Sequence, residues 1–397
     1  MAKRDVCRPH RVDSWEGVVG LMTFQISRIQ MMILMFWVVM GTGVLTMPLA
    51  IAHFTIRDGW IAALLFFGGS TFAAAICWLY AKAYPKTSLS DALVQSLGPY
   101  FGPVVVLWFV VWLAIHTALV SRQLLVFAEI TILPQTPLPV IAFAFFLPVT
   151  YGVSLGLEVI VRFGEFITPI ALPVSLLLTV LTIPNMHVHL LQPILADGWT
   201  PVLQAALQPA VAFAFQLILV LQILPHLRHP ETVGRDIFVV GAISTMALLA
   251  SEVVIITILG GSANYLQYPI LEAVRGIQIG RFIQRLDTLY VMGIVAVIFL
   301  KVGLLQYLFV SSLKSVLRLQ SLTGILMPAS AVTGAATIFL WRDTVSLSHY
   351  MISITPAYFA FTLGGLPLLA AVVKLIRPQT GQTGQKSGSK KGGLRTT

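Results

Sequence analysis

Four ionisable side chains lie inside long apolar stretches of this chain, where they are positioned to bind a ligand, a cation or a proton: Lys301, Glu252, His116 and Arg122. Such a side chain inside a membrane span is expensive and is usually functional. Lys301 lies near the middle of an apolar stretch that begins near residue 287. We predict that its ammonium contacts an anionic ligand group or replaces a bound metal cation. The alternative is a lysine paired with a carboxylate purely for packing.

Glu252 and His116 each allow two interpretations, whereas Arg122 has a structural one. Glu252 is the candidate partner of Lys301, or else a proton-responsive carboxylate of the kind that a coupled transporter needs. His116 is either hydrogen-bonded to a neighbouring carbonyl or part of a ligand site. Arg122 and Glu129 are seven residues apart and therefore on roughly one helix face, which predicts a structural charge pair.

Gly41-Thr42-Gly43 interrupts the first apolar stretch. Small residues there indicate either close packing of two helices or an unwound segment whose backbone groups bind a ligand at mid-membrane. In an inverted repeat of five plus five spans, the counterpart is the sixth span, which contains the uncharged amide Gln216. That span has no central glycine, so the sequence predicts a break more strongly in the first span than in the sixth.

The composition restricts the elements that can carry these side chains. The chain has 397 residues, of which 57% are hydrophobic and 10% charged, and its mean hydropathy is +0.89. A typical soluble domain is about 25% charged, so a soluble enzyme or a nucleic-acid-binding protein is excluded. Cys7 and Cys77 do not form a disulfide framework. No catalytic constellation, metal motif or phosphate loop is present, which predicts a protein that is not an enzyme and needs no cofactor.

The sequence predicts an all-α integral membrane protein. About 20 apolar residues cross a bilayer, and ten stretches qualify: 29–53, 60–80, 103–130, 139–156, 164–185, 207–227, 235–260, 287–312, 321–341 and 350–375. Eighteen of the 25 Lys and Arg residues fall on the side that holds both termini and five on the other, which predicts cytoplasmic termini. Segment 1–28 is then a cytoplasmic N-terminal segment that precedes the membrane domain 29–376. Segment 377–397 is predicted to be a disordered basic tail that touches membrane lipids. In the loop 261–286, Ile270, Leu271, Val274 and Ile277 recur at helical spacing and predict an amphipathic helix.

An ordered series of short motifs resembles the B-subunit family of spore germinant receptors, the spore germination permeases. The motifs are GTGVLTMP at 41–48, DGWI at 58–61, SR at 121–122, EVIVR at 158–162, QPILADGW at 192–199, YPILEA at 268–273 and FIQRLD at 282–287. The resemblance implies the fold of the amino acid–polyamine–organocation transporters, with inverted repeats at about 29–185 and 207–376.

The resemblance also implies a site among spans one, three, six and eight. Carried over residue by residue, its ligand-binding residues are Gly41, Thr42, Gly43, His116, Phe215, Gln216, Lys301 and Leu305. The implied protein lies in the inner spore membrane, binds a small germinant (an amino acid, a sugar or a nucleoside) and has a membrane A subunit and a lipoprotein C subunit as partners. The alternative function is a proton-coupled amino-acid permease with Glu252 as the coupling carboxylate.

Overall fold

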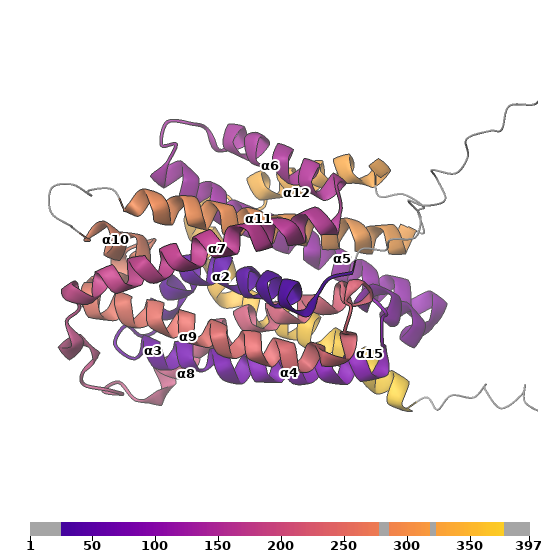
Figure 1. The fold of residues 1–397 in the computed structure, drawn as a ribbon, viewed down its shortest axis with the longest axis horizontal. Coiled ribbons are helices and arrows are strands. Elements are labelled where there is room, and N and C mark those ends of the chain that lie inside the picture. The colour runs from indigo at the N-terminus through magenta and orange to yellow at the C-terminus, as the bar shows by residue number, and fades with distance from the viewer. Residues whose placement is uncertain (1–24, 278–285, 318–322, 377–397) are drawn as a thin grey trace, which may run out of the picture.

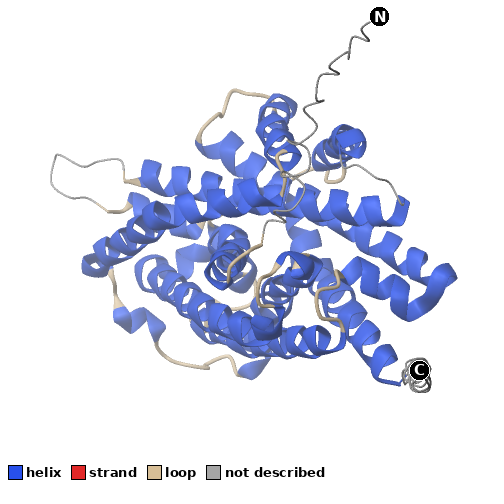
Figure 2. Ribbon diagram, turned by 45° about the vertical axis from the view of Figure 1, so that its right-hand side comes forward, coloured by secondary structure: helices blue, strands red, loops and turns tan. Residues whose placement is uncertain are grey.

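The computed structural model describes residues 25–277, 286–317 and 323–376, and almost all of these residues are helical (Figure 2). Outside the helices, the described chain contains one isolated parallel bridge, between Ile26 and Leu227. The predicted segments 1–28 and 377–397 lie almost wholly outside the described residues. The elements, several of them π- or 3-10-helical and labelled η, are α2 (Arg28–Ala52), α3 (Gly59–Leu64), α4 (Phe66–Ala83), α5 (Leu89–Thr131), α6 (Leu138–Ser154), α7 (Leu157–Thr182), η1 (Ile183–Asn185), η2 (Val188–Leu191), α8 (Trp199–Leu207), η3 (Gln208–Phe213), η4 (Ala214–Gln222), η5 (Leu224–His226), η6 (Pro230–Thr232), α9 (Val233–Leu259), η7 (Gly260–Tyr265), α10 (Pro269–Arg275), α11 (Asp287–Leu317), α12 (Thr323–Phe339), α13 (Thr344–His349), η8 (Tyr350–Ile354), α14 (Thr355–Phe359), η9 (Ala360–Gly365) and α15 (Leu366–Ile376).

Each of the ten predicted spans overlaps one of these helices or helix runs. Eight runs within the described residues are long and apolar enough to cross a membrane, and two shorter apolar helices, Leu138–Ser154 and Gly324–Phe339, match predicted spans four and nine. The all-α membrane fold is therefore confirmed, whereas the count of ten crossings stays a prediction. α5 consists of two helices that meet at Gly98, whose φ of 84° and ψ of −178° are not helical, and the second of them contains the predicted third span.

The first span is a continuous α-helix through Gly41-Thr42-Gly43. Ser27 and Gln30 form a capping box at its start, which satisfies two backbone donors that a helix N-terminus leaves free. A Cβ at Gly41 would lie 3.2 Å from Val297 Cγ1 of α11, and one at Gly43 would lie 3.1 Å from Leu248 Cδ2 of α9. The glycines thus let two helices approach α2 closely, as the packing interpretation predicts, and the unwound first span is not observed.

The irregular backbone lies instead in the sixth span, for which a break was predicted less strongly than for the first. This span begins as α8, changes to the π-helical segment η3 at Gln208 and continues as the 3-10 segment η4 to Gln222. Pro209 is the second residue of η3 and lacks a backbone donor. The tenth span contains two further π-helical segments, η8 and η9.

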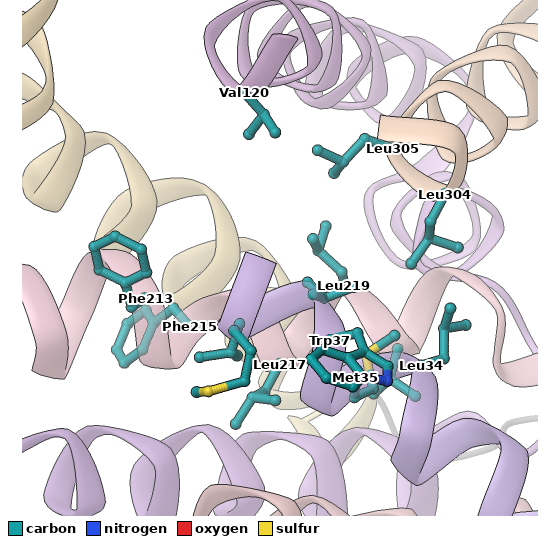
Figure 3. Packing of buried hydrophobic residues seen from close by; sticks show 14 of the residues in the cluster. Leu34, Met35, Trp37, Val120, Phe213, Phe215, Leu217, Leu219, Leu304 and Leu305 are labelled. Carbon is teal, nitrogen blue, oxygen red and sulfur yellow. The ribbon is translucent and has the colours of Figure 1, made fainter. Parts of the chain in front are cut away.

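Helices from the two halves of the chain pack side by side (Figure 1). α4 packs against α9, α5 against α11, α6 against α12 and α2 against η4, so four of the first five spans contact the span five places later. This pairing agrees with the predicted inverted repeat, whose boundaries stay a prediction. The buried core between them is apolar and includes Leu34 and Trp37 of α2, Leu217 and Leu219 of η4, and Leu304 of α11 (Figure 3).

The predicted amphipathic helix in the loop 261–286 is present as α10. All four of the residues that predicted it, Ile270, Leu271, Val274 and Ile277, are buried, and α10 packs against α9, α11 and α2. The helix is therefore seated on the bundle rather than free on a membrane surface. Most of the second half of that loop lies outside the described residues. α3, α8 and α10 lie at one end of the bundle, which we call the α10 end (Figure 1); the opposite end, where α2, α5 and α9 begin, is the Arg28 end.

A pair of adjacent glycines tests the packing of spans two and six. A Cβ at Gly69 would overlap the backbone carbonyl of Ala210 in η3, whereas nothing lies within 4 Å of one at Gly68. We expect Gly69→Ala to destabilise the protein by about 1–3 kcal/mol, because backbone does not yield to an added methyl group. Thermal melting of the purified proteins in detergent measures this, with Gly68→Ala as the matched control. Equal melting temperatures for the two variants would contradict the contact.

Candidate functional site

The Lys301 ammonium is the centre of a buried polar group that joins three spans. Nζ donates to Thr42 Oγ1 of α2 at 2.5 Å and to Gln216 Oε1 of η4 at 2.5 Å. All three side chains are buried, and Lys301 has no solvent exposure. The Gln216 amide in turn donates from Nε2 to the Ala212 carbonyl at 3.0 Å, which fixes its oxygen toward the lysine. Three of the predicted site residues are thus in direct contact.

Glu252 is not the partner of Lys301, so that predicted pairing is wrong. The Glu252 carboxylate lies beside Gly59 of α3: a Cβ atom added to Gly59 would be 3.5 Å from Glu252 Oε2. The same Cβ would be 2.9 Å from Ile51 Cγ2 of α2. Ile51 is nine residues beyond Thr42 on α2, which separates the two groups by roughly 13 Å along the helix. Glu252 is buried at the α10 end, and its Oε1 has no hydrogen-bond partner.

His116 is packed between aromatic rings and is not hydrogen-bonded to a neighbouring carbonyl. Its ring stacks on the Trp112 ring, with 5.1 Å between the ring centroids, and packs edge-to-face with the Phe359 ring of α14, with 4.8 Å between the centroids. Both ring nitrogens are buried without a hydrogen-bond partner. The imidazole also lies close enough to Lys301 for an electrostatic interaction between them, so spans three and eight both contribute to this site.

The remaining predicted residues do not join the polar group around Lys301. Leu305 is fully buried one turn beyond Lys301, across from Val120 of α5 (Figure 3). Phe215 packs instead against Phe72, at 5.9 Å between ring centroids. Arg122 is buried with an unpartnered Nε. The described residues show no contact-distance ion pair between it and Glu129, although Glu129 is near enough to interact with it electrostatically.

Two further glutamines of span six were missed by the sequence reasoning. At the Arg28 end, Gln222 Oε1 accepts from Ser90 N and Oγ, each at 3.1 Å, and its Nε2 donates to Ser312 Oγ at 2.9 Å. At the α10 end, the Gln208 amide donates to the carbonyls of Met351 and Ile352 in η8. Both residues carried the signal that identified Gln216, an uncharged amide within an apolar run.

The site is closed in this structure. The Lys301 amine donates to two oxygens, and these contacts bring together spans one, six and eight. No carboxylate among the described residues forms an ion pair with Lys301. A cavity of 670 Å³ lies elsewhere, between α5, α6 and α11. The chemistry available at Lys301 is therefore cation-mediated bridging of helices, with an aromatic wall at His116 and no metal-binding cluster among the described residues.

Comparison with known proteins shows the family to which this chain belongs. A protein-family model described as "Spore germination protein" matches residues 25–344. The chain belongs to this family. Spore germination protein KB of Bacillus subtilis (strain 168) is 26% identical over 294 residues, which cover 71% of this chain and 76% of that protein. Spore germination protein XB of Bacillus anthracis is 23% identical, over 67% of this chain and 74% of that protein. The predicted family resemblance is confirmed.

Solved transporter structures share the fold of this family member. The crystal structure of MhsT in complex with L-phenylalanine matches with a TM-score of 0.65 at 12% identity, covering 89% of this chain and 98% of MhsT. Mhp1, a nucleobase-cation-symport-1 family transporter in a closed conformation with bromovinylhydantoin bound, matches with a TM-score of 0.60 at 14% identity, covering 88% of this chain and 78% of Mhp1. The chain is therefore a transporter-like membrane protein connected with spore germination.

A double-mutant cycle tests the contact between Lys301 and Gln216. Lys301→Met leaves buried oxygens unsatisfied and should cost about 1–3 kcal/mol, and Gln216→Leu should cost at least as much because the buried charge loses a partner. Adding Gln216→Leu to Lys301→Met should then cost far less than Gln216→Leu alone. Thermal melting of the four proteins measures the coupling, and additive losses would contradict a direct interaction.

Proposed function

We propose that this chain is the nutrient-sensing membrane subunit of a spore germinant receptor. The observation that carries the proposal is the Lys301 amine, which is covalently fixed where spans one, six and eight meet. A transporter that uses an ion gradient binds and releases its cation, whereas a covalently attached lysine side chain stays in place. A sensor needs only that a ligand shift the population of two conformations.

The ligand of the proposed sensor is a small polar molecule that binds among Gly41, Thr42, Gly43, His116, Phe215, Gln216, Lys301 and Leu305. MhsT is solved with L-phenylalanine and Mhp1 with bromovinylhydantoin, both small molecules with polar and ring portions. The stacked rings of Trp112 and His116 beside Phe359 offer the same combination of apolar and polar contacts. An amino acid, a sugar or a nucleoside fits this description.

The proposal includes the assembly and its place in the cell. Homologues named as spore germination proteins support a receptor with a membrane A subunit and a lipoprotein C subunit in the inner spore membrane. The excess of Lys and Arg on one side supports cytoplasmic termini. Residues at the Arg28 end would then face the spore interior, and α10 would face outward.

Germination of spores that carry variants tests the sensor. We expect Lys301→Ala and His116→Ala to abolish the fall in optical density that individual amino acids, glucose or inosine induce in spores with the original chain, because both changes disturb the closed site. Ser175→Ala, on an exposed part of α7, is the control, and immunoblots verify equal protein amounts. An undiminished response to every nutrient in both variants would show that this site does not sense them.

The second candidate function is a proton-coupled amino-acid permease. It is favoured by Glu252, a buried carboxylate with an unpartnered oxygen and no ion pair in the described part of the chain. Burial of an unpaired carboxylate favours its neutral form, and a carboxyl that gains and loses a proton as the protein changes conformation is what proton coupling requires.

Uptake of radiolabelled amino acids into proteoliposomes distinguishes the two functions. The sensor predicts uptake at the level of empty liposomes, with or without a pH gradient, and no effect of Glu252→Gln. Gradient-driven uptake that Glu252→Gln abolishes would establish the permease. Glu158→Gln, which removes an exposed carboxylate paired with Arg162 at 2.7 Å, is the matched control.

A further inference from the structure

One face of α5 carries polar atoms that have no partner. Trp112, His116, Leu119 and Gln123 follow one another at spacings of four, three and four residues, which places them in a single stripe. The stripe faces span ten: Trp112 and His116 contact Phe359, Leu119 packs in a cluster with Met351, and Gln123 Nε2 lies 3.2 Å from Met351 Sδ.

The polar atoms along this seam are buried and unsatisfied. They are Trp112 Nε1, both ring nitrogens of His116 and Gln123 Oε1. Buried polar atoms almost always have a protein or water partner, so a row of them between two helices needs an explanation. Hydration of the seam in a second conformation satisfies them all. One turn from His116, Val120 of α5 lies across from Leu305, which is one turn from Lys301 on α11 (Figure 3).

The helix that covers the stripe has an irregular backbone. Span ten is interrupted by the π-helical segments η8 and η9, on either side of Phe359. Such segments occur frequently at functional sites. Two side chains of other spans bond η8: the Gln208 amide donates to the Met351 and Ile352 carbonyls, and the Gln123 amide donates to Met351 Sδ.

The Arg28 end of the bundle is closed more firmly. Gln222, Ser90 and Ser312 satisfy one another through four hydrogen bonds. Arg28 forms an ion pair with Asp236 at 2.5 Å, and the backbones of Ile26 and Leu227 are bridged. The α5–η8 seam is therefore the weaker of these two closures.

We propose that the seam between α5 and span ten is a gate that opens at the α10 end, with Gln208 as its latch, and that a small polar solute passes along the His116 stripe to reach Lys301. The solute is the germinant, and to that extent the inference rests on the proposed function. The gate itself is a property of the chain alone and is testable without any germinant.

Thiol labelling of the full-length chain in nanodiscs tests the gate. With Cys7→Ser and Cys77→Ala as background, Leu119→Cys reports on the stripe and Leu93→Cys on the Arg28 end, since both leucines are buried on α5. The probe is a charged, water-soluble methanethiosulfonate that carries a trimethylammonium group. Gln208→Leu removes two hydrogen bonds and should raise the labelling rate at position 119 about tenfold, a change equivalent to ~1.4 kcal/mol, without changing the rate at position 93.

Gln222→Leu is the matched control, because it removes a buried amide from the same span at the opposite end. It should accelerate labelling at position 93 and leave position 119 unchanged. Gln123→Leu, which removes the other bond to Met351, should act in the same direction as Gln208→Leu. Thermal melting verifies that each variant is folded.

Unchanged labelling at position 119 in both Gln208→Leu and Gln123→Leu, or equal acceleration by Gln222→Leu, would overturn the gate. These outcomes are independent of the proposed function, because no germinant is present. Conversely, latch-dependent labelling together with normal germination of Lys301→Ala spores would retain the gate and reject the sensor site.

Discussion

The arrangement of the helices depends on one buried ammonium. Lys301 is fully enclosed and meets only two oxygens, from Thr42 and Gln216. Burying an ammonium is expensive unless polar groups replace its water, so helices α2, η4 and α11 must meet at one depth and in one rotation. The close approach at Gly41 and Gly43 makes this possible, because a side chain there would push α2 away from α11 and α9.

The same requirement explains why span six rather than span one has an irregular backbone. The Gln216 oxygen reaches Lys301 only if its amide is held by the Ala212 carbonyl, inside the transition from π- to 3-10-helix. Thr42, by contrast, offers its hydroxyl from a regular helix. Three amides at three depths of span six, Gln208, Gln216 and Gln222, then connect it to spans ten, eight and three. Span six is thus fixed by polar contacts that the apolar core alone would not specify.

Sequence reasoning predicted depth well and pairing poorly, for a physical reason. Apolar runs and their charges show how far a residue lies along a span, and the family resemblance implied that Lys301, Thr42 and Gln216 belong to one site. Which side chains face one another depends on helix rotation and tilt, which distant packing contacts set. Glu252 therefore seemed a partner for Lys301, although it lies beside Gly59. The glycines of span one predicted small-residue packing or a break, and only their neighbours Val297 and Leu248 decide between the two.

The two ends of the bundle differ in how well their buried polar groups are hydrogen-bonded. Four hydrogen bonds among Gln222, Ser90 and Ser312 satisfy the Arg28 end, whereas the stripe from Trp112 to Gln123 is buried with its polar atoms unpaired. Burying a polar atom without a protein partner makes the closed state less favourable. In the proposed sensor, a ligand would then need little differential binding energy to change the populations, and because the Lys301 side chain is covalently attached, that energy would drive a conformational change rather than move an ion.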